Sequence, residues 1–193
     1  MHSAAPHLLH LLACNGVDHL ELEWRSKNKR DEKRWIDGRV KLDVRGVPSE
    51  ESHVMEYVDG SPVRYVHDLV GNAWYRKEKH RLGTWECDYA SKEEWRICAA
   101  NECTTPMDRP PAPGTLDKMM TREKIRKTYF VEPGWRLEFT RVRVRRGGDV
   151  DAEDAFETEL ELDDPSVFFL RPAWSVLEWG EKMLPYGTPP NAP

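Results

Sequence analysis

Polar and apolar residues alternate along much of this chain, and this period of two limits the possible folds more than any other feature. The clearest alternating runs are residues 20–25, 39–45, 135–140 and 157–162. Successive side chains of a strand point to opposite faces of a sheet, whereas an amphipathic helix repeats about every 3.6 residues. Aromatic and β-branched residues, which strands favour, are common in these runs. The pattern predicts an antiparallel sheet of hairpins, large enough to curl into a barrel.

A few segments depart from this alternation. Helices are expected at Ala4–Cys14 and Pro172–Met183, where the spacing no longer alternates. Proline, glycine and acidic residues predict loops at three places: Gly46–Pro62, Thr105–Gly114 and Gly147–Asp154. The terminal segment Tyr186–Pro193 is expected to be frayed and flexible.

Length and charge narrow the classes of protein that fit. A chain of 193 residues favours a single domain spanning 1–193, with a core at about 18–165. The net charge of −5 argues against a protein that coats nucleic acid, so an anionic substrate needs a local basic cluster. No apolar run approaches the roughly 20 residues of a membrane span. The four cysteines lack CxxC spacing and are typical of reduced thiols in a cytoplasmic or nuclear protein.

Three rows of like charge stand out within the predicted strands. Two rows are acidic and one is basic: Glu21 and Glu23; Glu157, Glu159 and Glu161; and Arg122, Lys124 and Arg126. Within each row the side chains share a face and lie about 7 Å apart. A solvated sheet face explains any one row. Their combination favours a barrel interior in which carboxylates hold Mg²⁺ or Mn²⁺ and cations hold phosphate oxygens.

Five segments occur in an order that resembles one known family. They are Glu21-Leu22-Glu23, Trp95–Glu102 followed by Thr105-Pro106, Arg122-x-Lys124-x-Arg126, Trp135–Thr140, and Glu157-x-Glu159-x-Glu161. With these motifs, residues Leu20 to Asp164 resemble the metal-dependent RNA triphosphatases of fungi, protists and large DNA viruses, within the triphosphate tunnel metalloenzyme superfamily. Glu138 departs from the pattern, because the family usually has the shorter Asp there.

The resemblance implies both a fold and an activity. The fold is an eight-stranded antiparallel β-barrel tunnel with a hydrophilic interior and a few flanking helices. The activity is metal-dependent hydrolysis of the γ-phosphate from triphosphate-ended RNA, the first step of mRNA capping, with nucleoside triphosphates as additional substrates. The expected cofactor is Mg²⁺ or Mn²⁺. A guanylyltransferase is the expected functional partner, and a monomer in the nucleus or cytoplasm is the expected state.

The resemblance also assigns a role to each motif residue. The metal ligands are Glu21, Glu23 and Glu161. The phosphate ligands are Arg122, Lys124 and Arg126, together with Arg64 and Lys79 from the loosely matched region, where Lys77, Arg76 and Arg81 are alternatives. Glu102 would position or deprotonate the attacking water. Glu157 and Glu159 are assigned with Glu102 to the catalytic residues, where they would hold metal-bound water or orient the basic row. The residues expected to support these groups are Glu138 and Thr140.

Two other functions fit the same motifs. One is an inorganic tripolyphosphatase or another small-triphosphate hydrolase of the superfamily, although those relatives usually open with an ExExK signature and Arg25 stands at that basic position. The other is a non-catalytic barrel that binds phosphate or RNA ends. Comparing γ-phosphate release from triphosphate RNA and from tripolyphosphate separates the two enzymes, and binding without turnover in the presence of metal would support the non-catalytic barrel.

Overall fold

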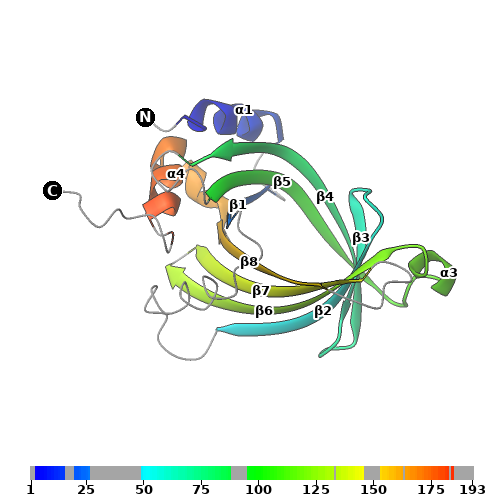
Figure 1. Cartoon of the computed structure of the whole chain (residues 1–193). Coiled ribbons are helices and arrows are strands. Elements are labelled where there is room, and N and C mark those ends of the chain that lie inside the picture. Colours follow the sequence, from blue (N-terminus) through cyan, green and yellow to red (C-terminus); the bar gives the residue numbers. More distant parts are fainter. Residues whose placement is uncertain are drawn as a thin grey trace.

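The chain folds into a closed antiparallel barrel (Figure 1). A computed structural model describes residues 3–15, 20–26, 49–87, 95–132, 134–145, 153–162, 164–182 and 184. The strands of these residues are β1 (Leu20–Ser26), β2 (Glu50–Val58), β3 (Val63–Asp68), β4 (Ala73–Glu86), β5 (Trp95–Met107), β6 (Met120–Glu132), β7 (Trp135–Arg145) and β8 (Glu153–Leu162). They pair in the order β1-β5-β4-β3-β2-β6-β7-β8, and β8 closes onto β1. The predicted eight-stranded barrel is confirmed.

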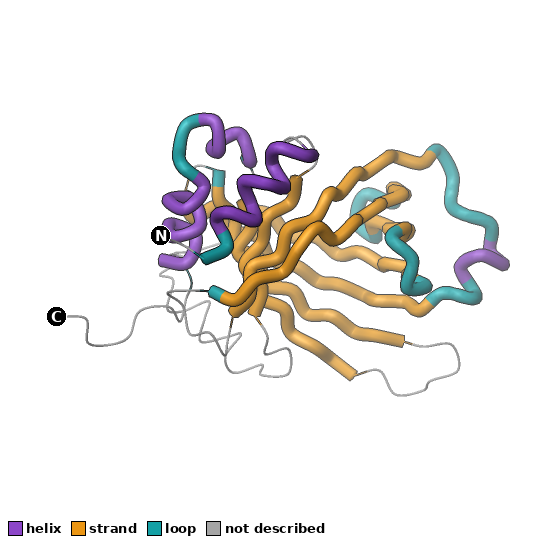
Figure 2. Tube along the Cα trace, turned by 90° about the horizontal axis from the view of Figure 1, so that it is seen from above, coloured by secondary structure: helices purple, strands orange, loops and turns teal. Residues whose placement is uncertain are grey.

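Helices stand at both ends of this barrel. The two predicted helices are confirmed as α1 (Ala5–Asn15) and α4 (Ala173–Lys182), and α4 follows the 3₁₀ turn η1 (Pro165–Phe169). The short helix α3 (Pro113–Leu116) was not predicted. Figures 1 and 2 show α1 and α4 together at one end and α3 at the opposite end. None of the helices formed by described residues is long and apolar enough to cross a membrane.

The hydrophobic core lies outside the barrel, between its wall and the helices. Trp24 and Trp135 are fully buried there, and their ring centroids are 5.1 Å apart. The helix α4 approaches both rings at Gly180, where an added Cβ would stand 2.5 Å from Trp24. Because strand faces alternate, the neighbours of Trp24, Glu23 and Arg25, point into the barrel. The apolar rows of the sequence therefore hold the helices, and the charged rows line the interior.

Two loop predictions need correction. Gly46–Pro62 was predicted as a loop, but β2 occupies Glu50–Val58. Both faces of β2 carry polar residues, so the alternation that identifies a half-buried strand is weak there. Thr105–Gly114 was also predicted as a loop, but β5 continues to Met107.

Pro106 indicated a loop, but it lies within β5. Beyond Asn101, which pairs with Leu20 at the start of β1, β5 has β4 as its neighbour among the described residues. Pro106 pairs with Tyr75 of β4. Proline is tolerated where one side of a strand lacks a partner, because its missing N–H is not needed there.

Several predictions fall on residues outside the described ranges. They are the strand at 39–45, most of the loop Gly147–Asp154 and the terminal segment Tyr186–Pro193. Residues 153 and 154 of that predicted loop belong to β8.

Candidate active site

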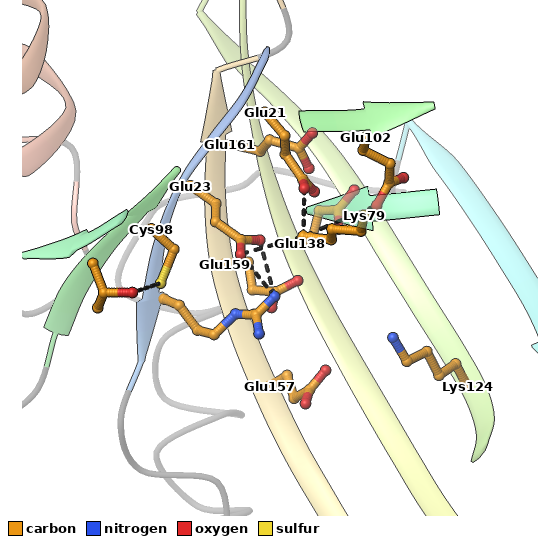
Figure 3. Close-up of polar contacts among 12 residues, drawn as sticks. Glu21, Glu23, Lys79, Cys98, Glu102, Lys124, Glu138, Glu157, Glu159 and Glu161 are labelled. Atoms are coloured by element: carbon orange, nitrogen blue, oxygen red, sulfur yellow. Dashed lines mark hydrogen bonds and ion pairs between the residues drawn. The ribbon is translucent and has the colours of Figure 1, made fainter. Parts of the chain in front are cut away.

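The interior of the barrel is lined by charged side chains, and their signs divide it into two regions. The acidic wall consists of the inward carboxylates of β1, β7 and β8: Glu21, Glu23, Glu138, Glu157, Glu159 and Glu161. The basic wall consists of the inward cations of β3, β4 and β6: Arg64, Lys77, Lys79, Arg122, Lys124 and Arg126. Figure 3 shows Lys124 on β6, across the interior from the carboxylates of β8.

The acidic wall is centred on a pair of facing carboxylates. Glu23 of β1 stands directly opposite Glu161 of β8 in the register of the two strands. Both are buried. Arg25, one inward position further along β1, forms ion pairs with Glu23 at 2.9 Å and with Glu159 at 2.6 Å. This arginine offsets part of the repulsion, and the sequence analysis gave it no role in the site.

The carboxylates of this pair are hard to ionise. Burial and then the nearby Glu159 raise the pKa of Glu23 to about 7, although Arg25 and Lys79 act to lower it. Burial also raises the pKa of Glu161 to about 8, with Glu138 as the next cause. Buried carboxylates that repel one another favour a bound proton or a bound cation. The acidic wall is therefore a place where added positive charge is stabilised.

Arginines of β6 and β7 pair with carboxylates of this acidic wall. Arg136 lies 2.6 Å from Glu161, and Arg126 lies 2.8 Å from Glu138. The Nε of Arg126 also donates a hydrogen bond of 3.2 Å to Thr140. Glu138 and Thr140 therefore orient Arg126, as expected for residues that support a ligand-binding group. Glu138 makes its ion pair although it is one methylene longer than the Asp usual in the family.

The basic wall surrounds one buried carboxylate that the sequence analysis missed. Glu56 of β2 lies 3.0 Å from Lys124, 3.5 Å from Arg122 and 3.7 Å from Arg64. Arg122 also reaches across the interior to Glu157 at 3.1 Å. Glu56 lies within the segment predicted as a loop, and only the pairing of β2 with β6 places it opposite Arg122. No local sequence signal identifies it.

Positive charge is in excess around Glu56. Burial raises the pKa of this carboxyl, but Lys124, Arg64 and Arg122 together outweigh burial and lower the pKa to about 2. For Lys124, burial lowers the pKa of the ammonium group, and the neighbouring cations Arg122 and Arg126 lower it further. A buried cation with a lowered pKa is stabilised by additional anions. The basic wall can therefore bind an anion besides Glu56.

Lysines of β4 join the two walls. Lys79 contacts Glu21 and lies 3.5 Å from Glu23 (Figure 3). Its neighbour Lys77 lies 2.8 Å from Glu102. Burial raises the pKa of Glu102, but Lys77, Lys79 and Arg64 together outweigh burial and lower it. Glu102 is therefore ionised at neutral pH and can accept a hydrogen bond.

The predicted site residues are brought together in the tunnel, although their roles stay predictions. Of the three alternatives to Arg64 and Lys79, Lys77 also lies inside. Arg76 lies on the outer face, where it pairs with Glu78 at 2.8 Å. Arg81 is exposed beside a bulge in β4. Arg136, like Glu56, is an inward residue that the sequence analysis did not assign.

The donor set of the acidic wall suits a hard divalent cation. Glu21, Glu23 and Glu161 offer carboxylate oxygens, the ligands that Mg²⁺ and Mn²⁺ prefer. Among the described residues, however, no group of three such side chains is arranged around one point. Lys79 and Arg136 hold these carboxylates instead. Binding of a divalent ion by these carboxylates would require the ion pairs of Lys79 and Arg136 to break.

Comparison with known proteins identifies the fold. No protein-family model matches the sequence, and no curated protein matches it. Among solved structures, the chain is similar to the Pct1 RNA triphosphatase of S. pombe in complex with the Spt5 CTD, with a TM-score of 0.71 and 13% identity over 96% of this chain and 91% of that one.

A viral structure has the same architecture. The Mimivirus capping enzyme triphosphatase matches with a TM-score of 0.58 and 14% identity over 93% of this chain and 96% of that one. These likenesses confirm that the chain has the fold expected from the sequence motifs, the tunnel of the RNA triphosphatases.

Proposed function

We propose that this protein is a metal-dependent RNA 5′-triphosphatase that converts a triphosphate RNA end to a diphosphate end. The observation that carries the proposal is the division of one closed interior into an acidic wall and a basic wall. The raised pKa values of Glu23 and Glu161 favour an added cation. The lowered pKa of Lys124 favours an added anion. A triphosphate bound to a divalent metal supplies both in one ligand.

The roles of the residues follow from the walls they occupy. Mg²⁺ or Mn²⁺, held by Glu21, Glu23 and Glu161, would supply positive charge to a γ-phosphate oxygen. Lys124, Arg122 and Arg64 would bind the other oxygens, with Glu56 holding the three in place. Arg126 and Lys79 complete the phosphate ligands.

The reaction transfers the γ-phosphoryl group to water. The bond between the β-phosphate oxygen and the γ-phosphorus breaks as a water oxygen attacks from the opposite side, leaving diphosphate-ended RNA and inorganic phosphate. Glu102, ionised beside Lys77, accepts a hydrogen bond from the water and orients it. The cations of the basic wall stabilise charge on the equatorial oxygens as the bond breaks. Free nucleoside triphosphates are expected as further substrates.

Release of labelled phosphate from γ-labelled triphosphate RNA, with and without Mg²⁺ or Mn²⁺, tests this function. We expect metal-dependent release and a diphosphate RNA product, the substrate that a guanylyltransferase uses. Faster release from tripolyphosphate than from RNA would instead indicate a small-triphosphate hydrolase. Binding of triphosphate RNA without turnover at any metal concentration would contradict an enzymatic role.

A further inference from the structure

A cavity of about 600 Å³ lies outside the tunnel, beside the segment that contains α3. Figures 1 and 2 show α3 at one end of the barrel. One side of the cavity is the segment that leads into and out of α3, including Arg109 and Pro111. The other side is the outer face of β2, β6 and β7, where Tyr57, Thr121 and Arg145 stand side by side in register. The proposed function does not use this cavity.

The cavity and the basic wall are opposite faces of the same strands. Tyr57 follows Glu56 along β2, and Thr121 precedes Arg122 along β6. Successive residues point to opposite faces, so Glu56 and Arg122 line the tunnel while Tyr57 and Thr121 line the cavity. A polymer whose end is bound by the basic wall needs to pass only the rim of the barrel to reach the cavity.

Two cations in the cavity are free to bind an anion. Arg109 and Arg145 are both exposed, and neither has an ion pair with any residue that the structure describes. Arg143, two positions before Arg145 on the same outer face, is by contrast bound to Asp154 at 3.0 Å. Asp117 also lines the cavity, so the cations exceed the carboxylates by one.

A row of stacked rings extends the cavity over the outer face of β2, β4 and β3. The rings of Tyr57 and Trp74 stack at 5.7 Å, and those of Trp74 and His67 at 4.4 Å. All three are half-buried, so part of each ring is accessible. Nucleobases stack on such rings, and this combination of aromatic faces with cations is typical of single-stranded nucleic acid sites.

We propose that this cavity and its aromatic row bind the first nucleotides of the RNA chain behind the triphosphate. Arg109 and Arg145 contact backbone phosphates, and Tyr57 stacks on a base. The inference rests on the proposed RNA triphosphatase function and adds what distinguishes an RNA end from a free nucleoside triphosphate. The charge argument favours RNA over a peptide, because the two available cations suit a polyanion.

The test separates binding of the chain from chemistry at its end. The variant carrying both Arg109→Ala and Arg145→Ala is compared with the parent for binding of a short single-stranded RNA with a 5′-hydroxyl, followed by fluorescence anisotropy. We expect affinity to fall about tenfold and the slope of log K against log salt to shrink by about 1.4, because two phosphate contacts are lost. KM for triphosphate RNA should rise similarly, while hydrolysis of a nucleoside triphosphate stays at the parent rate.

Lys118→Ala is the matched control. Lys118 is an exposed cation of the same connecting segment, but it lines a neighbouring cavity with Arg76 and Tyr65. RNA affinity should be unchanged in this variant. Tyr57→Phe, which keeps the stacking ring, should also bind as the parent does, whereas Tyr57→Ala should not.

Parent-like RNA affinity and KM in the double variant would overturn the proposal, and would leave a peptide as the better candidate for the cavity. Failure of the proposed function gives a different result. The parent would then release no phosphate from any triphosphate, while the double variant would still lose affinity for 5′-hydroxyl RNA.

Discussion

Glutamate behaves in opposite ways on the two walls of the tunnel. In the acidic wall, burial and neighbouring carboxylates raise the pKa of Glu23 to about 7 and of Glu161 to about 8. In the basic wall, Lys124 and two arginines overcome the effect of burial on Glu56 and lower its pKa to about 2. The sign of the surrounding charge, and not burial alone, decides which form is stable. One wall therefore favours a bound proton or a bound cation, and the other accommodates an anion.

Removing a charge from the acidic wall should have the largest effect on activity. Glu161→Gln keeps the size of the side chain but removes a proposed metal ligand, so phosphate release from triphosphate RNA should fall by about 10²-fold or more. The free energy of unfolding of metal-free protein should not fall, because the raised pKa shows that ionised Glu161 is unfavourable there. Phosphate release and urea unfolding measure the two quantities.

Asp154→Asn is the matched control on the same strand. Asp154 faces outward and pairs with Arg141 and Arg143. Its loss should leave phosphate release unchanged. Equal activity losses in the two variants would mean that the inward face of β8 has no special role.

In the basic wall, removing a carboxylate should instead lower the free energy of unfolding. Glu56→Gln removes the carboxylate shared by three cations, and it should lower the free energy of unfolding at pH 7 on the order of 3 kcal/mol. A lowered folded pKa stabilises the protein above the unfolded pKa of about 4.5, and this contribution is lost as pH falls toward 2. The difference between parent and variant should therefore close over that range in urea unfolding.

Glu23→Gln should change the free energy of unfolding in the opposite direction in the same assay. A raised folded pKa means that the parent loses stability as pH rises from about 4.5 through 7, because Glu23 is forced to ionise. The variant lacks this group and should become the more stable protein near pH 8 in the presence of a chelator. Parallel pH profiles for the two variants would show that the walls do not differ as described.

Metal should act on the acidic wall alone. A divalent ion that binds only the folded protein stabilises it by about 2.7 kcal/mol at a hundredfold excess over its Kd, which corresponds to a rise in Tm of roughly 5–10 °C for a chain of this size. Thermal unfolding with and without Mn²⁺ measures this rise. It should be smaller in Glu23→Gln and undiminished in Lys77→Met, which changes the basic wall. A rise of equal size in the parent and in Glu23→Gln is incompatible with the proposed ligands.

The smallest expected effect concerns the shape of one cation. Arg126 is held by Glu138 and Thr140, so its planar group has a defined direction. Arg126→Lys keeps the charge but loses a second hydrogen bond to phosphate, so activity should remain about tenfold below the parent. Steady-state phosphate release compares this variant with Arg126→Ala. Full activity with lysine would show that the basic wall acts only through its net charge.

Much of the fold and part of the site could be predicted from the sequence. Alternation identified β1, β7 and β8, and the spacing of Arg122, Lys124 and Arg126 placed these three cations on one face. Both are local properties, because backbone geometry alone sets the face on which a side chain lies. The segment 50–58 escaped prediction because its polar residues occupy both faces, one toward solvent and one toward the tunnel.

The pairing of residues distant in the chain could not be predicted in the same way. Glu56 stands 66 residues before Arg122, and nothing near either residue shows that they meet. Lys77 joins Arg64 and Lys79 inside the tunnel, and this likewise depended on which face of β4 turned inward. The position of the hydrophobic core could not be predicted from local alternation either, since Trp24 packs on helices outside the barrel.

The sequence by itself determined which side chains lie together on one face of each strand, and so it determined the acidic and basic rows. Only the tertiary structure decided that those rows point inward and face one another. The physical reason is that alternation is a property of neighbouring residues, whereas the inside of a barrel exists only after β8 pairs with β1. Closure brings rows of opposite sign into one buried space, and there their pKa values diverge.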